Sequence, residues 1–161
     1  MAVEAEVLKE LHRLRSRMPQ LTGALAASAD GLVLAQDMPD VEGEALAALT
    51  AAALGVGRRM VDLAARGEFR ELLVRGAEGY VATYAAGPAA VLTLLADDRA
   101  NVGRLHLEGR RSGGRIAELV AAARTEAERP SPSGEPATAP TVRDRILGAL
   151  PVRIPPQRHQ S

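Results

Sequence analysis

The sequence predicts an α+β domain in which a central sheet is covered by helices on both faces, with the element order α-β-β-α-β-β-β-α. Two adjoining strand segments, Leu21 to Asp37, are apolar on both sides, so both faces of their sheet need cover. A long alanine-rich helical segment, Glu42 to Arg66, follows at once. Three more strand segments then precede a last helical segment.

An amphipathic helix is expected from Ala2 to Met18, and Pro19 ends it. Charged residues in this segment exclude a signal peptide, and no apolar run in the chain reaches membrane-spanning length. We therefore expect a cytoplasmic protein with no direct membrane insertion. The apolar side of the helix comprises Val7, Leu11, Leu14 and Met18.

The hairpin after this helix turns at Asp30-Gly31. This dipeptide suits the positive φ angles of a two-residue type I′ loop. Such a loop pairs Ala29 with Leu32 and, further along the strands, Leu25 with Gln36.

The helix from Glu42 to Arg66 carries more apolar surface than one packing partner covers. One side of it is a seam of large apolar residues. Its other sides between Ala45 and Gly57 consist of alanine, leucine and glycine, with Thr50 the one polar residue. A helix that is apolar all round must be covered all round. We predict that one side packs on the chain's own sheet and that a second copy covers the rest in a homodimer. The alternative is a central helix enclosed by its own domain. The predicted dimer interface is the seam of apolar residues at alternating three- and four-residue spacing, Leu46, Leu49, Ala53, Val56, Met60 and Leu63.

Three strand segments follow: Phe69 to Arg75, Tyr80 to Ala85 and Ala89 to Ala96. The first is mostly charged on one side, which is typical of an edge strand. The third is an almost continuous apolar run, which is typical of a central strand buried on both faces.

The last helical segment runs from about Arg99 to Arg129, with Asp97-Asp98 as the predicted cap. Its middle, Gly109 to Gly114, contains three glycines, each of which costs about 1 kcal/mol relative to alanine in a helix. Two interpretations stay open: the glycines let the helix press closely on a neighbour, or the helix bends or breaks there.

The composition changes after Arg129, because seven of the ten prolines lie beyond it. We predict a domain over residues 1–129 and a Pro-rich, largely disordered tail over residues 130–161. Within the tail, Thr141 to Leu150 fits either an unstructured segment or a short helix that docks on a partner.

The composition excludes several classes of function. The chain has 20 basic and 20 acidic residues, and this neutrality argues against nucleic acid as a partner. It has no cysteine, which excludes disulfides, thiolate metal sites and a cysteine nucleophile.

No catalytic, metal or cofactor site is predicted. His12, His106 and His159 lie in separate segments without further ligands at metal-binding spacing. Gly109 to Ile116 has the glycine spacing of a P-loop without its Lys and Ser/Thr, and Gly55 to Gly57 lacks the third glycine of a dinucleotide-binding motif. We interpret both as chance matches.

Arginines gather on the last helical segment, at Arg104, Arg110, Arg111 and Arg115. The favoured interpretation is a solvated face, since the chain is neutral and poor in aromatic stacking residues. The alternative is a surface that meets a phosphate or an acidic partner.

Several segments of the chain together match the sequence pattern of a known family. They are the hairpin Gly23 to Ala35, the helix end Gly55-Val56-Gly57-Arg58-Arg59, Glu71 to Gly76, Gly79-Tyr80, Leu92 to Ala96 and Asn101-Val102-Gly103. Through these residues the chain resembles the roadblock/dynein light chain family over about Val3 to Ala127. The resemblance implies a five-stranded antiparallel sheet with one helix on one face and two on the other. It also implies homodimers or heterodimers joined through the long helix and an edge strand.

Members of this bacterial type act beside small Ras-like GTPases, often near membrane sensor kinases, and share no catalytic residue. The resemblance therefore implies a non-enzymatic dimeric regulator or scaffold that binds a small Ras-like GTPase in a cytoplasmic signalling complex. The candidate partner-binding residues are the polar cluster Arg58, Arg59, Asp62 and Arg66. Two alternatives are a small-molecule sensor domain and a structural assembly adaptor with no GTPase partner.

Overall fold

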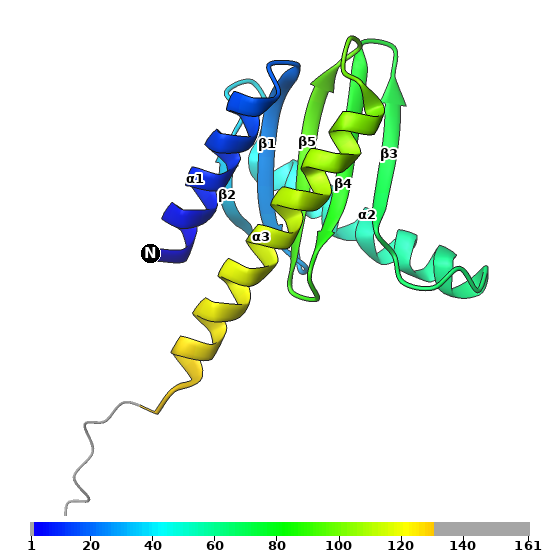
Figure 1. The fold of residues 1–161 in the computed structure, drawn as a ribbon. Coiled ribbons are helices and arrows are strands. Elements are labelled where there is room, and N and C mark those ends of the chain that lie inside the picture. The colour runs from blue at the N-terminus through cyan, green and yellow to red at the C-terminus, as the bar shows by residue number, and fades with distance from the viewer. Residues whose placement is uncertain (1, 131–161) are drawn as a thin grey trace, which may run out of the picture. The chain divides into compact units, whose positions relative to one another are not determined.

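The computed structural model describes residues 2–130 as eight elements around one sheet (Figure 1). The predicted tail from residue 131 onward, including its short-helix candidate, lies outside the described residues. The helices are α1 (Ala2–Arg17), α2 (Gly43–Leu63) and α3 (Val102–Glu128). The strands are β1 (Leu21–Ser28), β2 (Val33–Asp37), β3 (Glu71–Gly76), β4 (Gly79–Ala86) and β5 (Ala90–Asp97).

The five strands form one antiparallel sheet in the order β2-β1-β5-β4-β3. As Figure 1 shows, α1 and α3 cover one face of this sheet and α2 crosses the other. The predicted fold is therefore confirmed, with β3 at an edge and β5 in the centre as expected. No helix among residues 2–130 is long and apolar enough to span a membrane.

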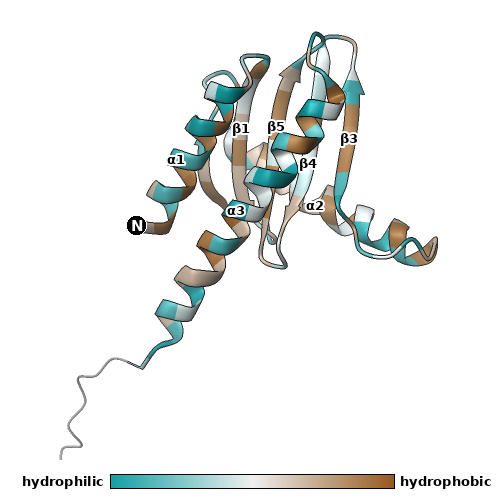
Figure 2. Cartoon of the chain, in the orientation of Figure 1, coloured by the Kyte–Doolittle hydropathy of each residue, from teal (hydrophilic) through white to brown (hydrophobic). Residues whose placement is uncertain are grey.

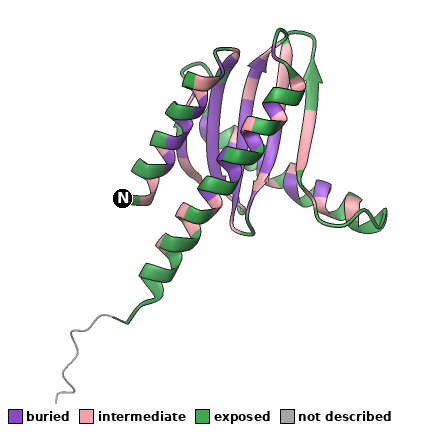
Figure 3. Cartoon of the chain, viewed as in Figure 1, coloured by how far each residue is buried: buried purple, intermediate pink, exposed green. Residues whose placement is uncertain are grey.

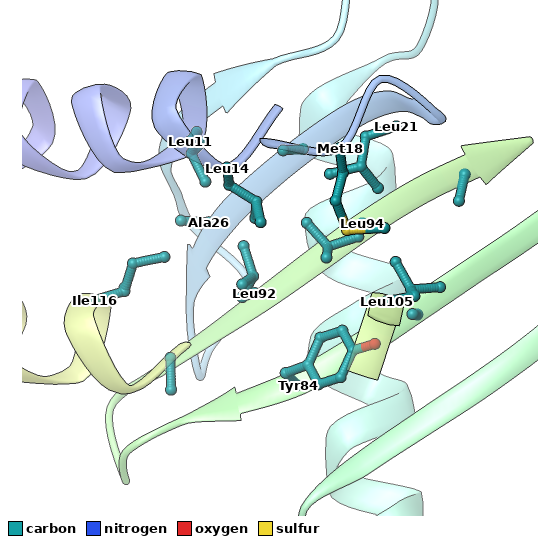
Figure 4. Close-up of a cluster of buried hydrophobic side chains, with 14 of the residues drawn as sticks. Leu11, Leu14, Met18, Leu21, Ala26, Tyr84, Leu92, Leu94, Leu105 and Ile116 are labelled. Carbon is teal, nitrogen blue, oxygen red and sulfur yellow. The ribbon is translucent and has the colours of Figure 1, made fainter. Parts of the chain in front are cut away.

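Each face of the sheet carries its own hydrophobic cluster, because successive strand residues point to opposite sides. Figure 4 shows Leu11 of α1 and Ile116 of α3 converging on Leu92 of β5 in the larger cluster. The smaller cluster, beneath α2, contains Leu25 of β1 and Leu54 of α2. β1 is buried on both of its faces, as predicted, whereas in β2 only Ala35 is buried and Gln36 is exposed.

The β1–β2 loop has three residues rather than the predicted two. The Ser28 amide donates to the Leu32 carbonyl at 2.8 Å, and the Leu32 amide donates to Ser28 Oγ at 3.0 Å. Ser28 and Leu32 therefore close the loop, and the predicted pairing of Ala29 with Leu32 is wrong. Among the residues of this loop only Gly31 takes a positive φ, 92°. A register shift after Ala26 absorbs the extra residue, so the pairing of Leu25 with Gln36 is as predicted.

The third helix starts later than predicted and runs without a break. Asn101, not Asp97-Asp98, caps it, because Asn101 Oδ1 accepts from the Arg104 amide at 2.9 Å. The structure confirms the first interpretation of the glycine-rich middle, in which the glycines let the helix press closely on a neighbour. Gly109 lies against the ring of Tyr84, where an added Cβ would be 2.4 Å from two ring carbons.

A buried polar network joins α1 to α3. Ser112 is fully buried and donates to Glu10 Oε1 at 2.7 Å, while Arg17 donates to Ser112 at 3.2 Å and to Glu108 at 2.8 Å. Each polar side chain of this network thus has a hydrogen-bond or ion-pair partner. This network fixes how the two helices lie beside each other.

Candidate protein-binding surface

One side of α2 packs on the sheet, and it is a side made of small residues. Thr50, the helix's one polar residue on this side, donates to the carbonyl of Ala47 at 3.0 Å, so its burial leaves no unpaired hydroxyl. Leu54 is the one large α2 side chain that is fully buried in the cluster beneath the helix, and the half-buried Leu46 packs against that cluster. The buried residues of α2 are Gly43, Ala47, Thr50, Leu54 and Gly57.

The predicted seam lies mostly on the side of α2 that no element of residues 2–130 covers. Leu46 and Ala53 are half-buried. The other four seam residues are exposed, at 68% for Leu49, 61% for Val56, 61% for Met60 and 72% for Leu63. In Figure 2 the end of α2 that extends past β3 alternates apolar and polar residues, and in Figure 3 its last part is mostly exposed. We call these four residues the α2 apolar face.

The polar cluster predicted as a partner-binding site is split by the end of the helix. Arg58, Arg59 and Asp62 belong to α2, but the helix stops at Leu63, so Arg66 lies beyond it. This corrects the predicted helix end, which placed Arg66 inside the helix and Gly67 just after it.

Two surface hollows divide this cluster. Arg58 and Asp62 line a hollow of about 520 Å³ beside the β4–β5 turn, which contributes Gly87 and Pro88. Arg66 lines a second hollow of about 350 Å³ on the side of β3. Arg59 is exposed and lines neither.

Phe69 lies between the two hollows and lines both, and the sequence interpretation gave it no role. Its ring packs against Gly57, where an added Cβ would be 2.4 Å from Phe69 Cε2. The ring thus joins the end of α2 to the segment that leads into β3. The available signal was a single phenylalanine in an otherwise aliphatic chain, directly after the long helix.

On the face of the sheet that α3 covers, several titratable side chains are hydrogen-bonded to one another. His106 Nδ1 lies 3.0 Å from the Tyr84 hydroxyl. Burial raises the pKa of the Tyr84 hydroxyl well above its usual range. The hydrogen bond from Arg110 holds the pKa of Glu71 below its usual value. Among residues 2–130 no group of three or more acidic or imidazole side chains is placed to hold a metal ion.

Comparison with known proteins gives a family and a fold. A family model described as Roadblock/LC7 domain matches residues 7–96. No curated protein sequence matches the chain.

Several solved structures share the fold. "MglB with tetrameric arrangement" is 23% identical, with a TM-score of 0.70, and the match covers 76% of this chain and 93% of that one. The gliding protein MglB from Thermus thermophilus is 23% identical over the same shares of the two chains, with a TM-score of 0.69. A Roadblock/LC7 domain from Streptomyces avermitilis is 25% identical, with a TM-score of 0.60, over 76% of this chain and 98% of that one.

Proposed function

Because the chain belongs to the Roadblock/LC7 family, we propose that it is a non-enzymatic homodimeric regulator or scaffold that binds a small Ras-like GTPase in a cytoplasmic signalling complex. The GTPase link rests on the resemblance to bacterial roadblock proteins. The observation that carries the proposal is the α2 apolar face. Four large apolar side chains on one helix face solvent in the single chain.

A second copy of the chain is the occupant that fits the α2 apolar face best. Complete burial of one such side chain is worth about 1.5–3 kcal/mol, so leaving four of them in water is costly. A two-fold axis across α2 brings the same face of each copy together. Ala52 is exposed and Gly55 has open space around it, so small residues between the large ones let two helices approach closely. One similar structure bears the description "MglB with tetrameric arrangement", which is in keeping with self-association in this fold.

The polar end of α2 is the proposed GTPase contact. Arg58 and Asp62 stand one helical turn apart over the hollow that Phe69 lines, with Arg59 and Arg66 exposed on either side. Charged side chains around a partly apolar hollow supply both orientation and contact area for a protein partner. This cluster lies next to Met60 and Leu63, so the proposed dimer interface and GTPase contact adjoin each other.

The test uses the full chain and a small Ras-like GTPase from the same organism. The GTPase, loaded with GDP or with a slowly hydrolysed GTP analogue, is passed over the immobilised protein, and GTP turnover is followed with and without it. We expect retention of at least one nucleotide form, and loss of most of it in the variant Arg58→Ala/Asp62→Ala.

A matched control removes the same pair of charges elsewhere. Asp98→Ala/Arg99→Ala alters exposed residues of the β5–α3 turn, far along the chain from α2, and should bind the GTPase normally. If neither nucleotide form is retained and turnover is unchanged, the GTPase link is refuted. If both double variants bind equally well, the GTPase contact lies elsewhere.

A further inference from the structure

We propose that the groove between α1 and α3 binds an extended acidic segment of a partner protein, whose carboxylates pair with Arg13, Arg104 and Arg111. This inference goes beyond the proposed function, because α1 and α3 lie on the face of the sheet opposite α2 (Figure 1). The groove is a hollow of about 540 Å³ lined by five arginines, Arg13, Arg17, Arg110, Arg111 and Arg115, and by two carboxylates, Glu10 and Glu118. Arg104 does not line the hollow; it lies on α3 where that helix meets the end of α1, and it donates to the Arg17 carbonyl.

Most of these arginines are already paired. Arg17 contacts Glu108 at 2.8 Å and Arg115 contacts Glu118 at 3.0 Å, while Arg110 is bonded to Glu71. They hold the walls of the groove in place, and the carboxylates balance part of their charge.

Three guanidiniums retain donors for a ligand. No carboxylate among residues 2–130 forms an ion pair with Arg111 or with Arg104, whose one side-chain bond is to the Arg17 carbonyl at 2.6 Å. Arg13 is 61% exposed, and its carboxylate partner, at 3.7 Å, is the buried Glu10 that already accepts from Ser112. A guanidinium that keeps its fork free is suited to a bidentate carboxylate contact.

The positive field of the groove acts on a neighbouring carboxylate. A hydrogen bond from Lys9 holds the pKa of Glu6 below its usual value, and the charges of Arg13 on α1 and Arg115 on α3 lower it further. Arginines from both helices therefore act on the same region of space.

The spacing of the arginines on α3 fits an extended peptide. Arg104, Arg111 and Arg115 are seven and four residues apart, which places them on one side of the helix. At 1.5 Å per residue the row from 104 to 115 is about 16 Å long, and Arg111 and Arg115 are about 6 Å apart along the axis. An extended chain presents alternate side chains about 6.6 Å apart, so a segment of about six residues with its acidic side chains on one side spans this row.

Other anionic partners fit this surface less well. A membrane-binding face needs apolar side chains that enter the lipid, but Leu107 is the one large apolar residue exposed on α1 or α3 within residues 2–130. Single-stranded nucleic acid needs aromatic rings for base stacking, and Tyr84, the aromatic residue beneath α3, is buried.

The proposal is tested with a fluorescein-labelled peptide of alternating glutamate and glycine, by fluorescence anisotropy on the full chain. We expect saturable binding that weakens as salt is added, and no binding of the same peptide with glutamine for glutamate. The variant Arg13→Ala/Arg111→Ala should bind at least about tenfold more weakly, a combined loss of about 1.4 kcal/mol for the two contacts. Both side chains are exposed, so the fold is kept.

The matched control is Arg75→Ala/Arg99→Ala, which removes two exposed arginines outside the groove. Equal weakening in both double variants would mean that only net charge attracts the peptide, and it would overturn the proposal. The proposal would also be overturned if the wild-type chain did not bind the peptide. The same holds if the chain bound only phosphatidylserine vesicles and that binding depended on Arg13 and Arg111. Val56→Arg, on the α2 apolar face, should leave peptide binding unchanged, so failure here is separable from failure of the GTPase proposal.

Discussion

The backbone amide of Arg66 donates to the carbonyl of Val61 at 2.9 Å and closes the end of α2. Together with the bond from the Ala65 amide to the Asp62 carbonyl at 3.1 Å, it forms a Schellman motif. The motif puts Ala65 in the left-handed region, at a φ of 51°, where glycine is usual. The polar end of α2 therefore has a defined geometry, and one residue of the cap is strained.

Ala65→Gly should stabilise the protein by about 0.5–1 kcal/mol, because glycine takes the left-handed conformation without the steric cost of a Cβ. Urea denaturation measures the change. Ala64→Gly is the control: Ala64 has a φ of −83°, so glycine there only adds freedom to the unfolded chain and should destabilise. A loss of stability in Ala65→Gly would contradict the cap geometry.

Gly109→Ala should destabilise the protein by about 1–3 kcal/mol, although alanine is the better helix former by about 1 kcal/mol. The added Cβ would be 2.4 Å from the buried Tyr84 ring, which must move. Gly114→Ala, in the same helix, meets no atom within 4 Å and should be stabilising. Thermal or urea unfolding measures the change in stability of the two variants. If both substitutions were stabilising, α3 would not be packed closely on Tyr84.

Val56→Arg should turn a dimer into a folded monomer. Val56 is 61% exposed in the single chain, so arginine is tolerated there, but at a packed interface it buries an unpaired charge at a cost of several kcal/mol. Light scattering coupled to size exclusion gives the mass, and circular dichroism checks the fold. Leu107→Arg, at a side chain 65% exposed on α3, should leave the mass unchanged. A wild-type chain that is monomeric at micromolar concentration would refute the dimer.

Ser112→Ala should cost about 1.5–3 kcal/mol, because it removes a hydrogen bond to the buried carboxylate of Glu10. The control is Ser16→Ala. Ser16 is exposed and donates only to the His12 carbonyl, so its loss should change the free energy of unfolding by less than about 0.5 kcal/mol. Equal effects of the two changes would mean that Glu10 does not depend on Ser112.

Stability should fall on acidification partly through Glu71. Its folded-state pKa is lowered from 4.5 by the hydrogen bond from Arg110, so its contribution is present above pH 4.5 and is lost as the pH falls through the folded-state value. Glu71→Gln should therefore lose less thermal stability between pH 6 and the acid range than the wild type, with the difference appearing below pH 4.5. Glu126→Gln, at an exposed position on α3, should follow the wild type.

Periodicity predicted the element order and both layers correctly, because burial on one or both sides leaves a direct record in the sequence. The sequence pattern is apolar on both sides in two segments, Ala24 to Ala27 and, apart from Thr93, Val91 to Leu94. Both segments are buried between helices in the structure. The exposure of Leu49 and Met60 also follows from an apolar pattern that exceeds what one sheet covers.

The ends of elements were predicted less well, since single hydrogen bonds decide them. Ser28 Oγ lengthened the hairpin loop by one residue, and Asn101 took the cap expected at Asp97-Asp98. A left-handed alanine at position 65 ended α2 before the glycine that usually signals an end. Phe69 was missed for a similar reason: its contact with Gly57 joins residues twelve apart in the chain and leaves no periodic trace.

The two-layer arrangement of the helices also sets a stoichiometry. When two copies pair through α2, the α1–α3 layer of each copy is left on the outside. The two arginine grooves then face away from each other, because the sheet and α2 of each copy lie between its groove and the two-fold axis of the dimer. One short acidic segment cannot occupy both. With both proposals combined, a dimer would recruit two such segments, either from separate molecules or from one long chain that reaches both grooves, and only the second case gains affinity from being bivalent.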